Sequence, residues 1–127
     1  MNIKSAKQLV EEANKVINKM TPNEVKSAFE KGEVTLIDIR DIRELWKEGT
    51  IKNSMHIPRG MLEFWLDPEG AYFKQGKLDL NKEMVLFCAG GMRSALAAKS
   101  LKEMGFKKVS HIDGGFGALK QSKFKIT

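Results

Sequence analysis

Residues 85–106, VLFCAGGMRSALAAKSLKEMGF, carry the pattern that decides the fold of this chain. The apolar run 83–88 reads as a buried strand, and the amphipathic stretch 94–105 reads as a strong helix. Between them lies a short loop with two glycines, which opens with the only cysteine of the chain, Cys88. In an open α/β sheet, ligands bind beyond the carboxyl ends of the strands, where the next helix begins. The sequence therefore places Cys88 at the floor of a binding crevice.

The loop chemistry favours a reactive Cys88 over a cysteine that merely fills a buried strand end. The start of a helix offers unpaired N–H groups and the positive end of the helix dipole. Gly90 and Gly91 can adopt a positive φ, which lets successive N–H groups curl inward around an anion. Arg93 adds a permanent positive charge. Such surroundings stabilise a thiolate, the nucleophilic form of cysteine, without a histidine base.

The remaining chain alternates strands with helices. The sequence predicts strands at 34–40, 54–58, 83–88 and 108–113, and helices at 3–20, 21–32, 41–49, 61–66, 94–105 and 114–121. The rest of the section 59–80 is expected to be loop around Pro68, Gly70 and Gly76. Strands that alternate with helices indicate a parallel sheet covered on both faces, so the fold class is α/β.

Composition bounds the class of protein. The chain has 127 residues, with 42% hydrophobic and 30% charged residues, which is ordinary for one globular domain. No apolar run approaches the length of a membrane-spanning helix, and the N-terminus lacks an apolar signal core, so we expect no membrane association. A single cysteine cannot form an internal disulfide, which favours a cytoplasmic protein.

The net charge of +6 arises mainly from 18 lysines that are spread along the sequence without a dense cluster. This pattern is typical of a solvated surface, and it argues against a nucleic-acid groove, which favours clustered, arginine-rich stripes. A secondary interpretation is that the positive field attracts small anionic substrates.

Two segments resemble the rhodanese family of single-domain sulfurtransferases. The first, FCAGGMRSALAAKSLKEMGFKKVSHIDGGF (87–116), contains the family's loop pattern Cys-x-x-Gly-x-Arg-Ser. The second, LIDIRDIRELWKEGTIKNSMHIPRG (36–60), is similar to the family's Asp-x-Arg strand and its Ile-Pro ending. The resemblance covers about residues 21–120 and implies a rhodanese-like fold with a central, mainly parallel sheet of about five short strands. Residues 1–20 are then an N-terminal amphipathic helix that packs on a rhodanese-like domain over 21–127.

The resemblance also implies a two-step sulfur transfer. Cys88 would take a sulfane sulfur from a small anionic donor such as thiosulfate, and would pass it from a persulfide to a thiol or cyanide-like acceptor. A protein could also serve as donor or acceptor, and neither a metal nor an organic cofactor is needed. The loop residues that would stabilise the persulfide are Ala89, Gly90, Gly91, Met92, Arg93 and Ser94. Arg93 would either hold the anionic donor or brace the loop.

Two alternatives stay open at this point. A module on the same fold could carry sulfur, sense oxidants or bind a protein without turnover. Cysteine-dependent phosphatases and arsenate reductases use Cys-x5-Arg, whereas only four residues separate Cys88 from Arg93, so this activity is disfavoured.

Further residues belong to the predicted site or its surroundings. Asp38 and Arg40 are predicted to anchor a strand end near the site, with Glu44 as a partner. Arg59 and Trp65 are candidates for the wall of the substrate pocket.

Two histidines are expected to be packed strand residues. His56 and His111 both lie in predicted strands, and neither stands where a catalytic partner is expected.

Overall fold

Five short strands pair into one all-parallel sheet in the computed structural model, which describes residues 2–127. The order across the sheet is β1-β5-β4-β2-β3. The strands are β1 (Asn18–Met20), β2 (Val34–Asp38), β3 (Met55–His56), β4 (Glu83–Phe87) and β5 (Val109–Ile112). The predicted α/β class and the parallel sheet are confirmed.

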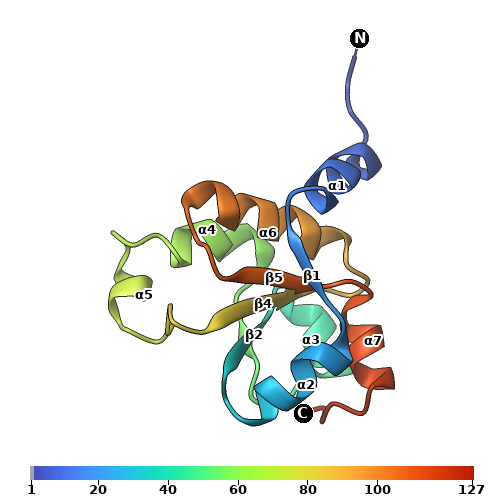
Figure 1. The fold of residues 1–127 in the computed structure, drawn as a ribbon, viewed down its shortest axis with the longest axis vertical. Helices are drawn as coiled ribbons and strands as arrows, with labels where there is room; N and C mark the ends of the chain where they lie inside the picture. The colour runs from blue at the N-terminus through green and yellow to red at the C-terminus, as the bar shows by residue number, and fades with distance from the viewer. Residues whose placement is uncertain (1) are drawn as a thin grey trace.

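Helices cover both faces of this sheet. Figure 1 shows α1, α4 and α6 on one face and α2 and α7 on the other. The helices are α1 (Ala6–Asn14), α2 (Pro22–Glu30), α3 (Ile42–Glu48), α4 (Leu62–Trp65), α5 (Ala71–Lys74), α6 (Met92–Met104) and α7 (Gly115–Gln121), with a 3-10 turn η1 (Arg59–Met61).

Alternation along β4 divides the core into two clusters. Met84 and Leu86 point into the cluster beneath α4 and α6, and Cys88, just past the strand, continues this side. Val85 and Phe87 point into the cluster beneath α2 and α7. Successive side chains of a strand point to opposite faces, so a strand covered on both sides needs the continuous apolar run that the sequence has here.

The prediction of one helix over 3–20 is wrong for its second half. Helix α1 begins at Ala6 with a Ser5–Gln8 capping box and ends at Asn14. The chain then turns, and Asn18–Met20 pairs with Ser110–Ile112 as an edge strand of the sheet. Helical spacing of apolar residues cannot reveal that β5 offers a free parallel edge, because this pairing depends on residues about ninety positions away. The division of the chain at residue 20 stays a prediction.

Smaller differences concern element ends. Helix α6 begins at Met92, two residues before the predicted start, because Gly91 leaves the loop in a left-handed conformation. Helix α5 lies within a section predicted as loop. None of the helices in residues 2–127 has the length and apolarity that crossing a lipid bilayer requires.

Candidate active site

Cys88 lies directly after β4, and its sulfur accepts hydrogen bonds from the loop that follows. The N–H groups of Gly91 and Ser94 donate to Cys88 Sγ at 3.1 and 3.4 Å. Gly91 has φ +110°, as predicted, whereas Gly90 is outside the positive-φ region, contrary to expectation. One left-handed glycine is enough because it turns the chain into α6 and directs both N–H groups toward the sulfur. Backbone N–H groups that converge in this way form a concavity of the kind that binds anions.

A polar pair lies behind the sulfur. The Cys88 thiol donates to Ser94 Oγ at 3.5 Å, and Ser94 Oγ lies 2.8 Å from His111 Nδ1. All three side chains are buried, and His111 Nε2 has no hydrogen-bond partner in the described chain. Burial lowers the pKa of His111, which favours the neutral ring.

Sequence reasoning placed His111 in a buried strand, which is correct, but missed its contact with the site. The predicted burial was a signal for such a contact, because a buried histidine is nearly always hydrogen-bonded.

The first turn of α7 packs against the backbone of the cysteine loop. Phe116 N–H donates to the Cys88 carbonyl oxygen at 2.8 Å. Gly115 has φ +60°, and a Cβ atom there would stand 2.4 Å from the Cys88 carbonyl oxygen and 2.6 Å from that of Ala89. Only glycine allows this approach, so α7 fixes the backbone around the cysteine.

Arg93 forms an ion pair with Glu44 in the first turn of α3. Its Nη1 and Nη2 atoms donate to the two carboxylate oxygens of Glu44 at 2.8 and 3.0 Å. The Arg93 hydrogen bond lowers the pKa of Glu44 and raises the pKa of Arg93 in turn. Of the two roles considered for Arg93, this geometry corresponds to bracing the loop.

Asp38 and Arg40 form a buried ion pair with each other. Arg40 Nη2 donates to Asp38 Oδ2 at 2.8 Å and to the Gly49 carbonyl oxygen at 2.7 Å. Thr50 Oγ1 donates to the same carboxylate at 2.6 Å, and the Arg40 guanidinium lies 4.0 Å from the Phe116 ring centre. The prediction that Glu44 would join this pair is wrong because Arg93 occupies that carboxylate.

The two candidate pocket residues have other contacts. Arg59 pairs with Glu63 one turn later at 2.8 Å. Trp65 stacks on Tyr72 with ring centres 4.9 Å apart and packs against the core beneath α4 and α6. These contacts correspond to a cap on the core, and a role in substrate binding stays a prediction for both residues.

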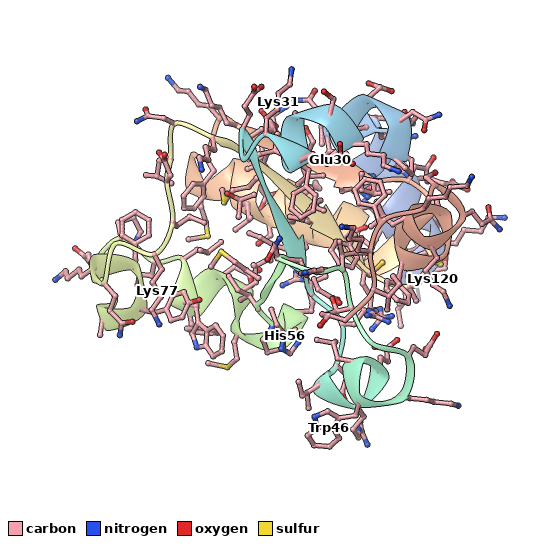
Figure 2. The ribbon with its side chains drawn as sticks, turned by 90° about the horizontal axis from the view of Figure 1, so that it is seen from below. Glu30, Lys31, Trp46, His56, Lys77 and Lys120 are labelled. Carbon is pink, nitrogen blue, oxygen red and sulfur yellow. The ribbon has the colours of Figure 1, made fainter. Side chains whose placement is uncertain are left out.

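Several loop residues are exposed to solvent, although the cysteine that they follow is buried. Ala89, Gly90 and Met92 are exposed, whereas Cys88 is 1% exposed. A broad depression of about 690 Å³ adjoins the loop through Arg93 and is otherwise lined by the start and outer side of α3. Figure 2 shows α3 with Trp46 at the lower edge of the molecule and His56 just above it.

The family model of the rhodanese-like domain matches residues 21–122, which include the whole loop and all strands except β1. The chain belongs to the rhodanese-like family. YtwF of Bacillus subtilis, a candidate sulfurtransferase, is 41% identical over 86 residues, which are 68% of this chain and 73% of YtwF.

Two solved structures extend this rhodanese likeness. A Rhodopseudomonas palustris protein of unknown function, described as a possible tyrosine phosphatase, is 41% identical, with a TM-score of 0.89 over 100% of this chain and 97% of that one. The polysulfide-sulfur transferase homodimer of Wolinella succinogenes is 31% identical, with a TM-score of 0.72 over 95% of this chain and 85% of that one.

Other relatives are much longer than this chain. The tRNA uridine(34) hydroxylase of Escherichia fergusonii is 32% identical over 104 residues, but the match spans only 29% of that protein.

Proposed function

We propose that this protein is a sulfurtransferase that carries sulfane sulfur as a persulfide on Cys88. The observation that supports it best is the pair of N–H groups, from Gly91 and Ser94, that point at one sulfur atom. Donors fixed in place before reaction stabilise negative charge without reorganisation. The sulfurtransferases among the relatives add support.

The first step is attack of the Cys88 thiolate on the outer sulfur of a donor such as thiosulfate. A new S–S bond forms to Cys88, the S–S bond of thiosulfate breaks, and sulfite leaves with the electron pair. In the second step, an acceptor such as cyanide attacks the outer persulfide sulfur. Thiocyanate leaves, and the Cys88 thiolate is restored. Both steps conserve charge and need no external oxidant.

The protein groups have separate roles in this scheme. The Gly91 and Ser94 N–H groups hold the charge on sulfur, while the Ser94 hydroxyl and His111 are positioning residues behind it. The Glu44–Arg93 pair fixes the loop to α3. The remaining loop residues, Ala89, Gly90 and Met92, are exposed, so they line the route by which a donor or acceptor approaches.

The test is intact-protein mass after incubation with thiosulfate, 3-mercaptopyruvate or polysulfide. We expect wild type to gain one sulfur atom with at least one donor, and cyanide to remove it. Cys88→Ser should gain nothing, while Ser110→Ala, a buried serine on the neighbouring strand that bonds Glu83 instead, should load normally. Loading without release to cyanide or thiols would favour a carrier that delivers sulfur only to a protein.

A phosphatase is the second candidate function, because the Rhodopseudomonas palustris relative is described as a possible tyrosine phosphatase. Its loop would have to enclose a tetrahedral oxyanion, but only four residues separate Cys88 from Arg93, and Arg93 is engaged by Glu44. Hydrolysis of p-nitrophenyl phosphate that is lost in Cys88→Ser, together with no sulfur uptake from any of the three donors, would favour the phosphatase.

A further inference from the structure

We propose a second ligand site, for a nucleoside phosphate, in the pocket between α2, the turn after Thr50 and the C-terminal segment. This pocket has a volume of about 460 Å³, within the range of small-molecule sites. It is lined by Lys26, Phe29, Glu30, Lys52, Asn53, Lys123, Phe124 and Lys125, none of which belongs to the Cys88 loop. In Figure 2, Glu30 at the rim of this pocket lies in the upper part of the molecule, while His56 and Trp46 lie in the lower part.

The lysines come from three separate segments and meet only in the folded chain. Lys26 Nζ is held by the Ser122 carbonyl oxygen at 2.8 Å and lies 5.5 Å from the Phe124 ring centre, so it forms part of the pocket frame. The ammonium groups of Lys52, Lys123 and Lys125 form no ion pair within residues 2–127. Glu30 is the only acidic residue of the lining. The site therefore has an excess of three positive charges.

Two of these lysines face each other across paired backbone segments. Lys52 N–H donates to the Lys125 carbonyl oxygen at 2.8 Å, next to the antiparallel bridge between Ile51 and Ile126. Like charges directly opposite each other on paired strands are destabilising. Folding thus brings together charges that repel, and a bound anion would relieve this repulsion.

Two residues of the pocket lining have an unusual backbone conformation. Among residues 2–127, Asn53 and Lys123 are the only non-glycine residues with positive φ, at 70° and 65°, and both line it. Asparagine adopts this conformation readily, but lysine does not, and glycine is the usual residue at such a position after a helix. At Lys123 this conformation caps α7: Lys123 N–H donates to the Lys120 carbonyl oxygen at 3.1 Å and Phe124 N–H to that of Leu119 at 3.2 Å, which fixes the chain where it enters the pocket lining.

The lining selects the chemical class of the ligand. Three free ammonium groups suit a phosphate, which carries up to two negative charges and several acceptor oxygens. Phe29 is half-buried and Phe124 is 7% exposed, and both add apolar lining that suits the contact with a base. A single nucleotide combines both features at a size that fits a half-open pocket of about 460 Å³.

The experiment is a titration of the isotope-labelled full chain with adenosine monophosphate, followed by the amide signals of Lys52, Asn53 and Lys125. We expect saturable shifts with a Kd of about 1 mM or below. Lys52→Glu should weaken binding by about 10-fold or more, as expected for the loss of one ammonium–phosphate contact and the gain of repulsion. The same change replaces a Lys–Lys pair by a Glu–Lys pair, so the free variant should have a raised thermal midpoint. Weaker binding therefore cannot be ascribed to unfolding.

Controls separate the site from net charge and from the cysteine. Lys7→Glu makes the same charge change on the exposed side of α1 and should leave the Kd within twofold. Cys88→Ser should also leave it unchanged, so the result is independent of sulfur transfer. Adenosine or inorganic phosphate alone should bind more weakly than the nucleotide.

Three outcomes would overturn the proposal. The first is no shift of these amides at several millimolar nucleotide, and the second is an equal loss of affinity in Lys7→Glu and Lys52→Glu. The third is tighter binding of inorganic phosphate or of a single-stranded RNA oligonucleotide than of the mononucleotide. Either result would mean that the lysines of this pocket bind a different class of ligand.

Discussion

Gly115→Ala tests the claim that the first turn of α7 sets the geometry of the cysteine loop. The added Cβ would stand 2.4 Å from the Cys88 carbonyl oxygen and 2.6 Å from the Ala89 carbonyl oxygen, both backbone atoms. A left-handed conformation costs a residue with a Cβ about 1–2 kcal/mol, and overpacking costs about 1–3 kcal/mol. We therefore expect a loss of about 2–5 kcal/mol in the free energy of unfolding.

The functional effect should exceed the effect on folding. Relief of the clash must move the backbone that aims N–H groups at Sγ, and a shift of about 1 Å in a reacting group can lower a rate about 100-fold. The assays are urea unfolding and the rate of sulfur uptake, the latter under conditions in which circular dichroism shows a folded variant. We expect uptake to fall by about 10–100-fold.

The matched control lies two residues away in the same helix. A Cβ atom added at Gly117 would have no atom within 4 Å, and this glycine has no positive φ, so Gly117→Ala should stabilise the protein by up to about 1 kcal/mol. It should leave sulfur uptake unchanged. If the free energy of unfolding of Gly115→Ala lies within about 0.5 kcal/mol of the wild-type value, and the variant loads sulfur at the wild-type rate, the claim that α7 fixes the loop is wrong.

Three further changes test the polar contacts around the site. Asp38→Asn should cost about 3–5 kcal/mol in urea unfolding, because it leaves the buried Arg40 charge uncompensated; a cost below about 1 kcal/mol would show that the pair is solvated. Glu44→Gln should cost about 0.5–1 kcal/mol near neutral pH, since the pair with Arg93 is half-exposed. Because the folded-state pKa of Glu44 is below 4.5, this difference should be present above that pH and vanish as the pH falls further; a difference that persists in acid would contradict an ionic contribution. Because the pKa of His111 is lowered in the folded chain, the unfolded chain binds a proton at this histidine at a higher pH than the folded chain does. The free energy of unfolding should therefore decrease as the pH drops below about 6.5, and His111→Asn should remove this contribution to its pH dependence.

Local sequence was sufficient for the elements whose signals lie within a few residues. The helix predicted over 21–32 is present as α2, which begins at Pro22 with a Thr21–Glu24 capping box. The apolar run to Cys88 and the glycine after it predicted a strand, a turn and a helix in this order. These predictions succeed because capping, turn conformation and burial of a whole strand depend on neighbouring side chains.

Contacts between distant segments could not be predicted in this way. Asn18–Met20 became a strand because β5 had a free edge, although its apolar spacing continued that of α1. The sequence predicts Glu44 as a partner of Asp38 and Arg40, but in the fold α3 packs beside the loop and Glu44 pairs with Arg93, 49 residues away. His111 reaches Ser94 only because β5 lies next to β4.

The class of fold, the rhodanese-like loop and the position of Cys88 within it could all be read from the sequence, because they follow from local pattern and from the order of residues in one short motif. Which charges meet depended on the folded arrangement of the chain. Lysines that are scattered along the sequence gather in one pocket with Lys52 opposite Lys125, while Arg93 pairs with Glu44 of α3. The physical reason is that electrostatic partners are set by distance in space, and the sheet order and helix packing that fix those distances are non-local.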